Sequence, residues 1–236
     1  MTSSPQSINH LNWTDIARQL DIVGYALLPG ILPGEQAKSL ASQVSADVDV
    51  MSRVSLASSD LGRGDLFYLG DQLPAPLQGW RTDFYRHLAP IANRWNEMLD
   101  VAYRYPNELD TFLQRNREAG QARMLSHLNR LGVADYLALH QRSEGEYVFP
   151  LQIVALLTEP GQDFEGGEFV MIERRPRMQS RPMVLPLKRG DAAIISTAQR
   201  PFKGSKGYYR VNLKHAVSRV HRGQRVGLEL SFHNAP

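Results

Sequence analysis

Apolar positions in the first half of the chain recur with helical spacing. Between residues 13 and 20 they return every three or four positions, and an apolar run at 22–28 then ends at Pro29 and Gly30, which predicts a helix, a strand and a turn. Residues 60–79 are rich in Gly, Pro and Asp and are expected to form a long loop. Further helices are predicted at 33–48, 80–104, 109–117 and 122–131.

After residue 134 the pattern changes to short apolar runs separated by turns. These runs lie at 147–157, 168–172, 183–187, 191–195, 208–217 and 225–232. Short strands at such spacing are typical of a sandwich or barrel, and the amphipathic helices would cover one of its faces. We therefore predict one α+β domain over residues 1–236, with a mainly helical N-terminal segment (1–133) and a barrel core (134–236).

The last predicted strand separates its two faces clearly. Its apolar face holds Val226, Leu228, Leu230 and Phe232. Its polar face holds Arg225, Gly227, Glu229, Ser231 and His233. Because side chains alternate along a strand, the apolar face is expected to pack against helices, and the polar face is expected to line a wet pocket inside the barrel.

Composition narrows the possible chemistry. The 236 residues include no Cys, which excludes disulfides and thiolate metal sites, predicts a reducing, cytoplasmic location, and leaves only His, Asp and Glu as metal ligands. An excess of 27 Lys and Arg over 24 Asp and Glu permits a nucleic-acid partner without requiring one. The first residues lack a signal-peptide pattern and no window holds eighteen consecutive apolar residues, so neither secretion nor membrane insertion is expected.

Two of the seven histidines lie in positions that favour a site. His140 ends a predicted strand, and His215 lies on another, ten residues before Arg225. On strands of one barrel, these three side chains can converge on its interior. Strand alternation also directs Tyr136 and Ser231 the same way as His140 and Arg225, so either hydroxyl could complete a carboxylate site.

Gln152 is the lone polar residue inside an apolar strand. A buried amide must find hydrogen-bond partners, and a bound ligand is one candidate.

These residues, in this order and spacing, resemble the Fe(II)/2-oxoglutarate-dependent oxygenases. That family carries a His-x-Asp/Glu motif, a distal His, and an Arg about ten residues beyond it, which His140, His215 and Arg225 match. The resemblance extends to segments 24–32, 163–169 and 188–195, and more narrowly to segments 88–95, 148–152, 175–180 and 210–215, which look like a bacterial subgroup described as oxygenases acting on damaged nucleic acid.

The resemblance implies a fold, two cofactors and a reaction. The fold is a double-stranded β-helix, a jelly-roll or cupin-like barrel, with helices packed on one sheet. His140 and His215 would bind Fe(II), and the guanidinium of Arg225 would hold the distal carboxylate of 2-oxoglutarate through paired donors. Decarboxylation of this cosubstrate would be coupled to hydroxylation or oxidative demethylation of a small molecule or a damaged nucleic acid.

The sequence departs from the family at the motif carboxylate, where Arg142 stands. An Arg offers no acceptor atom to a metal, and its repulsion of a divalent ion across about 4–6 Å would cost on the order of several kcal/mol. Glu144 or Glu146 could supply a substitute ligand, or an external anion could fill the position, as in halogenating relatives.

Two readings without iron also follow from Arg142. The barrel could be a catalytically silent protein that binds a ligand or partner. Alternatively, it could be a metal-independent enzyme in which Arg142 positions an anionic substrate while His140 or His215 moves protons.

A basic hairpin is a further candidate surface. Segment 173–181 contains four Arg, and basic side chains recur at Lys203, Lys206, Arg210 and Lys214. They could contact nucleic-acid phosphates, or they could form an ordinary solvated face.

Overall fold

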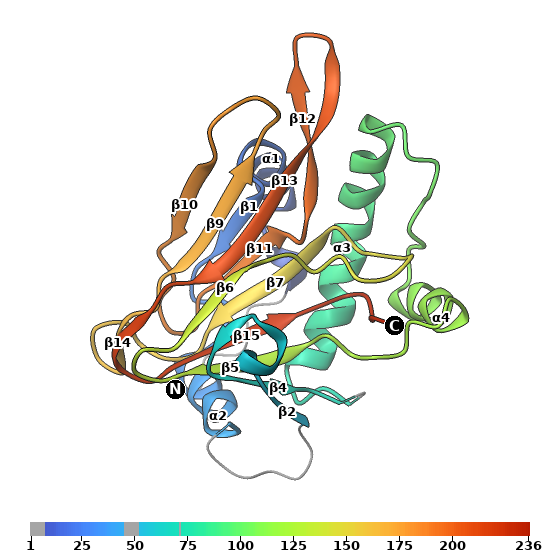
Figure 1. The fold of residues 1–236 in the computed structure, drawn as a ribbon. Coiled ribbons are helices and arrows are strands. Elements are labelled where there is room, and N and C mark those ends of the chain that lie inside the picture. The colour runs from blue at the N-terminus through green and yellow to red at the C-terminus, as the bar shows by residue number, and fades with distance from the viewer. Residues whose placement is uncertain (1–7, 45–51, 71) are drawn as a thin grey trace.

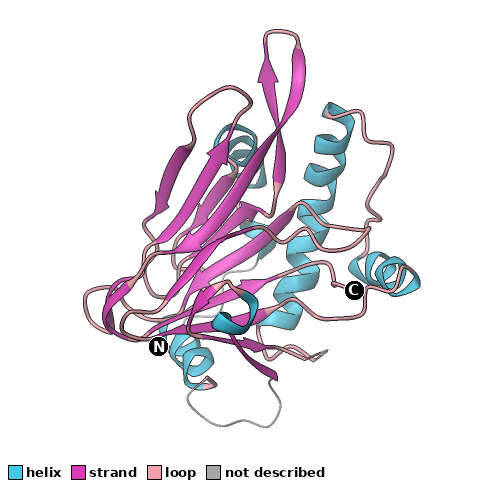
Figure 2. Ribbon diagram, in the orientation of Figure 1, coloured by secondary structure: helices cyan, strands magenta, loops and turns pink. Residues whose placement is uncertain are grey.

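Two antiparallel β-sheets face each other in the computed structural model (Figures 1 and 2), which describes residues 8–44, 52–70 and 72–236. In order across the first sheet, the seven strands are β1 (Tyr25–Leu28), β11 (Ala192–Ser196), β7 (Leu151–Leu156), β15 (Arg225–Leu230), β5 (His127–Leu131), β4 (Asp65–Tyr68) and β2 (Ser52–Ser55). The second sheet runs β10 (Arg181–Leu185), β9 (Phe169–Arg174), β13 (Gly207–Val217), β6 (Tyr136–His140) and β3 (Gly62–Arg63), with β12 (Gln199–Gly204) paired to β13. A separate pair joins β8 (Phe164–Gly166) to β14 (Val220–Gly223).

The helices precede most of the strands and cover the outer face of the seven-stranded sheet. They are α1 (Trp13–Val23), α2 (Gly34–Ser42), α3 (Leu77–Met98) and α4 (Leu109–Glu118), with 3-10 turns at Ile8–His10 and Leu56–Ser59. Phe84 and Leu88 of α3 share one buried apolar cluster with Leu228 and Leu230 of β15. The prediction that the apolar face of the last strand packs against helices is confirmed, as is the α+β double-stranded β-helix with helices on one sheet (Figure 1). No described helix has both the length and the apolar character needed to cross a membrane.

A second apolar cluster fills the space between the two sheets. Val154 and Leu156 of β7 meet Leu213 and Val217 of β13 there. The side chains of His140, His215 and Glu229 are buried on the same inward faces. The barrel interior is therefore apolar over part of its length and polar over the rest.

The structure corrects several predicted elements. The predicted helix at 122–131 is wrong, because β5 occupies 127–131 and pairs with β15. Alternate burial explains this: Leu128 joins the helix-side cluster, while Leu131 lies between the sheets. The expected loop at 60–79 contains β3, β4 and the start of α3, and α3 ends at Met98 rather than near residue 104. The helix predicted at 33–48 ends at Ser42, and its positions 45–48 lie outside the described residues. The seven-stranded sheet thus recruits strands from the segment expected to be helical.

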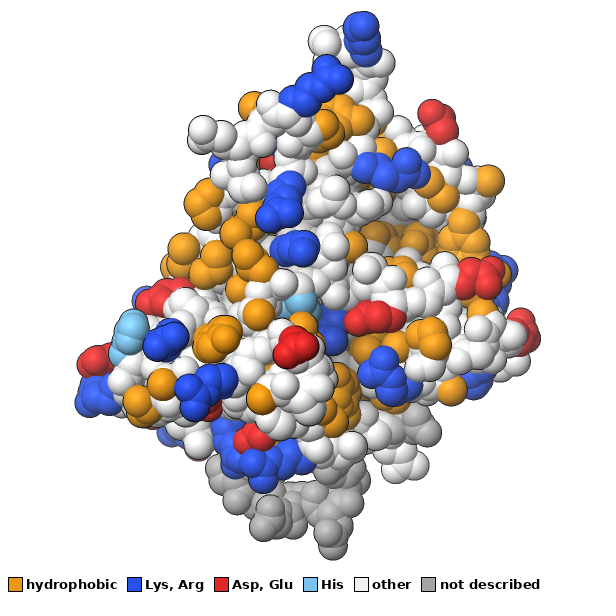
Figure 3. Space-filling view, viewed as in Figure 1, with side chains coloured by type: hydrophobic (Ala, Val, Ile, Leu, Met, Phe, Trp, Pro, Cys, Tyr) orange, Lys and Arg blue, Asp and Glu red, His pale blue; other side chains and the backbone are white. Residues whose placement is uncertain are grey.

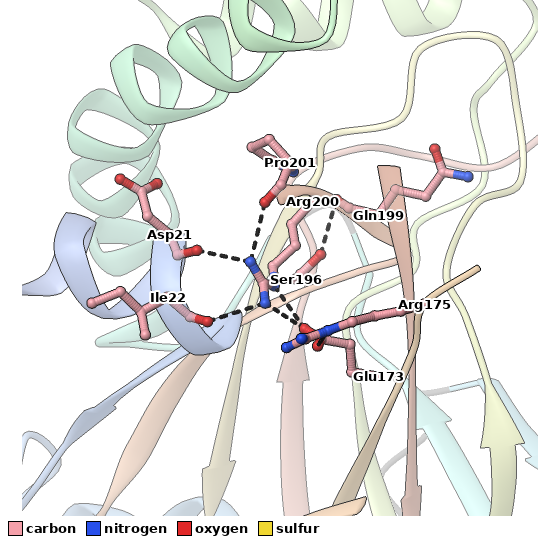
Figure 4. Close-up of polar contacts among 8 residues, drawn as sticks. All are labelled: Asp21, Ile22, Glu173, Arg175, Ser196, Gln199, Arg200 and Pro201. Carbon is pink, nitrogen blue, oxygen red and sulfur yellow. Dashed lines mark hydrogen bonds and ion pairs between the residues drawn. The ribbon is translucent and has the colours of Figure 1, made fainter. Parts of the chain in front are cut away.

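A buried ion pair ties the end of α1 to the second sheet (Figure 4). The Nε atom of Arg200 donates to Oε2 of Glu173 at 3.1 Å, and both side chains are almost fully buried. The Nη1 and Nη2 atoms of Arg200 donate to the carbonyl oxygens of Asp21 and Ile22, at 2.7 and 3.1 Å. The chain leaves α1 immediately afterwards at Gly24, whose φ of 80° suits a glycine. This guanidinium therefore satisfies carbonyl groups that the helix end leaves without partners.

Candidate metal centre

Three potential metal ligands meet between the sheets. His140 on β6 and His215 on β13 are direct cross-strand partners, and their ring centroids lie 4.2 Å apart. Glu229 faces them from β15 in the opposite sheet. One ligand atom from each residue lies within 4.8 Å of the other two, and all three side chains are buried. Two imidazoles and one carboxylate form the ligand set that non-haem Fe(II) oxygenases use.

Hydrogen bonding leaves one ring nitrogen of His140 available to a metal. Its Nδ1 atom lies 2.9 Å from the carbonyl oxygen of Ala138, so Nδ1–H donates to that carbonyl and Nε2 keeps its lone pair. This Nε2 atom is buried and has no hydrogen-bond partner among the described residues. Burial, and then the proximity of His215, lowers the pKa of His140 to about 3. The ring is therefore neutral at pH 7, as a metal ligand must be.

Polar groups surround the other two ligands. Nε2 of His215 lies 3.3 Å from the side-chain nitrogen of Gln152 and 3.5 Å from Oε2 of Glu229. His127 lies on the far side, with Nε2 3.8 Å from Oε1 of Glu229. Burial by itself would raise the pKa of Glu229, but these histidines and the Arg142 guanidinium hold it well below its usual range. Glu229 is therefore an ionised carboxylate, and neither of its oxygens has a hydrogen-bond partner among the described residues.

Arg142 lies beside this cluster rather than in solvent. Its side chain is 4% exposed, and its Nε atom is 3.9 Å from Oε2 of Glu229. Its Nε and Nη2 atoms have no hydrogen-bond partner among the described residues. A buried guanidinium with two unused donors is costly unless a ligand uses them.

Arg225 occupies the inward face of β15, two alternate positions from Glu229. Its Nε donates to the carbonyl oxygen of Gly167 at 2.8 Å, and its Nη1 donates to Oδ1 of Asn129 at 3.0 Å. Burial lowers the pKa of Arg225 to about 10, so the guanidinium stays charged at pH 7. Gly227 lies between Arg225 and Glu229 on this face. A Cβ atom at Gly227 would meet Nη1 of Arg225 at 2.7 Å, so the absence of a side chain here gives the guanidinium its room.

Other predicted site residues lie where the sequence did not place them. Glu144 and Glu146 are exposed in the loop after β6, so neither joins the cluster, and the carboxylate that meets the two histidines is that of Glu229. Tyr136 does not share the inward face of His140, because a β-bulge pairs Leu137 with Val217 and shifts the alternation by one residue. Leu137, instead of Tyr136, lies in the inter-sheet cluster.

Gln152 and Ser231 have separate outcomes. Gln152 is buried beside His215, and its Oε1 atom has no partner among the described residues, so its role in ligand binding stays a prediction. Ser231 is buried, but it is six residues from Arg225 along an extended chain, a separation of about 20 Å. It therefore cannot share one carboxylate with Arg225.

The residues that the sequence prediction missed are Glu229, His127, Asn129 and His233. Three of them come from β5 and β15, which pair Glu229 with His127 and Gly227 with Asn129. The strand alternation did place Glu229 on the polar face of Arg225, and that signal could have identified it. His127 and Asn129 were hidden by the incorrect helix prediction. His233 is fully buried with both ring nitrogens unpartnered in the described structure, and burial lowers its pKa to about 3.

Comparison with known proteins places the chain in a family. Residues 64–235 match Oxygenase-NA, described as an oxygenase catalysing oxidative methylation of damaged DNA. Uncharacterized protein Rv2227 of Mycobacterium tuberculosis strain H37Rv is 38% identical over 166 residues, which cover 69% of this chain and 71% of that protein. Uncharacterized protein MT2286 of strain CDC 1551 matches equally.

Solved structures share the fold. A prolyl-4-hydroxylase from Pseudomonas putida aligns with a TM-score of 0.55 at 12% identity, over 95% of this chain and 99% of that chain. A prolyl hydroxylase from Trichoplax adhaerens, in complex with a peptide fragment of the hypoxia inducible factor oxygen degradation domain, aligns with a TM-score of 0.51 at 11% identity, over 94% and 88%. The family match covers most of the sequence, and the architecture is the one those enzymes have. The chain belongs to the Oxygenase-NA family.

Proposed function

We propose that this chain is an Fe(II)- and 2-oxoglutarate-dependent oxygenase whose metal is held by His140, His215 and Glu229. The observation that carries the proposal is the convergence of three potential ligand atoms within 4.8 Å, with a carboxylate supplied by β15 in place of the motif position, residue 142, which lies just after β6. Bound iron would supply the oxidising chemistry that couples decarboxylation of 2-oxoglutarate to hydroxylation or oxidative demethylation.

The residues around the cluster fit these cofactors. The free Nε2 lone pair of His140 and the two unpartnered oxygens of Glu229 are groups that a divalent metal would satisfy. Arg225 is the guanidinium proposed to hold the distal carboxylate of 2-oxoglutarate, with Asn129 and the Gly167 carbonyl orienting it. The burial of His140 excludes bulk water and keeps the ring unprotonated.

The proposal is tested by anaerobic titration of metal-stripped protein with Fe(II), followed by 2-oxoglutarate. The unaltered protein should bind about one equivalent of Fe(II) and develop the visible charge-transfer band of a chelated 2-oxo acid. Glu229→Gln should weaken Fe(II) binding at least tenfold, because it removes the only anionic ligand. Glu144→Gln and Glu146→Gln are matched controls and should bind Fe(II) normally. Undetectable Fe(II) binding, or equal binding by Glu229→Gln, would reject the proposed centre.

A catalytically silent ligand-binding barrel is the second candidate, and the buried Arg142 guanidinium favours it. In that case Glu229 would serve as the counter-ion of Arg142, 3.9 Å away, and no metal would bind. The same titration separates the two candidates. Absence of Fe(II) binding by the unaltered protein, together with its appearance in Arg142→Asp, would support the silent barrel.

The substrate proposal keeps two classes. The family description supports a damaged nucleic acid, and Lys and Arg side chains follow one another down the face that carries the β12–β13 hairpin (Figure 3), where Lys203, Lys206 and Arg210 are exposed. A small molecule is the alternative, supported by the near-complete burial of the ligand cluster. Binding of single-stranded DNA that weakens steeply with salt, and that is reduced by Lys203→Gln and Lys206→Gln, would select nucleic acid.

A further inference from the structure

The position that carries the metal-binding carboxylate in related oxygenases is filled here by a buried cation. Arg142 is 3% exposed, so its guanidinium is withdrawn from solvent. The barrel interior also holds Arg225, whose charge both Glu229 and Glu168 offset, whereas the carboxylate beside Arg142 is that of Glu229, 3.9 Å from Nε. Glu229 is thus shared between two guanidinium groups, and Arg142 has no carboxylate within hydrogen-bond range among the described residues.

The unused donors of Arg142 lie on one edge of its guanidinium. They are Nε and Nη2, which point in parallel on the side of the group away from Cδ. A carboxylate accepts two such parallel hydrogen bonds at once, and this paired geometry is the strongest that Arg makes with an anion. Glu229 does not fill this role, since its nearest oxygen is 3.9 Å from Nε, beyond hydrogen-bond range.

Among the described residues, no neighbouring group accepts a hydrogen bond from this edge. Both ring nitrogens of His233 also lack partners in the described structure, so His233 can add a hydrogen bond.

We propose that Arg142 is a carboxylate-binding residue, which receives the acid group of a small carboxylic acid directly beside the His140, His215 and Glu229 cluster. This inference rests on the proposed function for its location, but the binding step itself requires only Arg142. The acid group has two sources, the 2-oxo acid cosubstrate and a substrate that is itself an organic acid. In either case the guanidinium of Arg142 binds the acid group, and Glu229 is the carboxylate of the neighbouring cluster.

The test uses calorimetric titration of full-length protein loaded with Mn(II), a redox-silent substitute for Fe(II). The first probe is 2-oxoglutarate, and the second is propionate added after 2-oxoglutarate has saturated. Arg142→Gln should raise the Kd of at least one probe by tenfold or more, equivalent to about 1.4 kcal/mol. Arg142→Lys keeps the charge but loses the paired donors, so its Kd should lie between the values of the unaltered protein and of Arg142→Gln. Arg123→Gln, on the exposed surface, is the control.

The two probes distinguish the sources of the carboxylate. A weakened 2-oxoglutarate interaction assigns Arg142 to the cosubstrate, and a weakened propionate interaction alone assigns it to an acidic substrate. Unchanged binding of both probes in Arg142→Gln overturns the inference, as does undetectable binding of both by the unaltered protein. Melting temperatures of the variants without ligand show whether each is folded, and Arg142→Lys provides the comparison if Arg142→Gln is not.

Separate readouts keep the inference distinct from the proposed function. Mn(II) affinity is measured first in every variant. If Mn(II) still binds and Arg142→Gln binds both carboxylates with unchanged Kd values, only the inference is rejected. If no Mn(II) binds, the proposed centre is rejected, and the 2-oxoglutarate titration is repeated on metal-free protein. Loss of 2-oxoglutarate binding in Arg142→Gln then still supports a carboxylate site at Arg142. Unchanged 2-oxoglutarate binding in that variant overturns the inference.

Discussion

Removing the charge of Glu173 should destabilise the fold strongly, because it leaves the buried guanidinium of Arg200 without a counter-ion. The two side chains are 1% and 0% exposed, and Arg200 also holds the last carbonyls of α1 (Figure 4). Breaking a buried ion pair by removing one partner costs about 3–5 kcal/mol. Arg175 approaches the other oxygen of Glu173 at 2.6 Å, so Glu173→Gln leaves two cations uncompensated. We therefore expect the upper part of that range.

The loss is measured by urea denaturation, followed by the fluorescence of the three tryptophans. In a chain of this size, 3–5 kcal/mol corresponds to a fall in melting temperature of about 6–20 °C. Glu165→Gln is the matched control, because Glu165 pairs with Arg222 at a similar distance while both side chains are more than half exposed. An exposed pair contributes about 0–1 kcal/mol, so this control should unfold nearly as the unaltered protein does.

A double variant checks the cause. Glu173→Met combined with Arg200→Met removes both charges and should recover much of the loss, since replacing a buried pair by apolar groups of similar volume is often neutral. Two results would refute the reasoning. One is a loss in the free energy of unfolding below about 1 kcal/mol for Glu173→Gln. The other is a loss in the double variant that exceeds the sum of the losses in the two single variants.

Three further predictions concern the barrel interior. Arg142→Asp should lower the Kd for Mn(II) at least tenfold, because it replaces a repelling charge by a carboxylate; equal affinity in calorimetry would contradict this. Gly227→Ala should weaken 2-oxoglutarate binding, since its Cβ would meet the Arg225 guanidinium at 2.7 Å, and an unchanged Kd would show that Arg225 does not hold the cosubstrate. Metal-free protein should lose stability as the pH falls from 6.5 towards 4, by up to about 1.4 kcal/mol per pH unit for each buried histidine of lowered pKa, because the unfolded chain binds protons that the folded chain excludes. Urea denaturation across this range should therefore give a positive slope of stability against pH, and a flat profile would count against it. These histidines are His127, His140 and His233, with pKa values of about 4, 3 and 3.

The sequence by itself determined the local features of this protein. The alternation along 225–232 separates the helix-facing side from the inward side, and the structure has the same division. The order and spacing of His140, His215 and Arg225 led to the correct fold, because these residues do lie on strands of one barrel. The replacement of the motif carboxylate by Arg142 was also evident without a structure.

Tertiary structure decided which carboxylate meets the two histidines. Glu229 is 89 residues from His140 in the chain and lies in the opposite sheet, so no local spacing connects them. Residues 127–131 form β5 despite the helical spacing of 122–131, since pairing with β15 and burial on both faces stabilise a strand there. The bulge that turns Tyr136 away from the interior likewise depends on the pairing of β6 with β13. Periodicity reports the faces of a single element, whereas a metal or anion site is made by the approach of several elements, and that approach depends on packing.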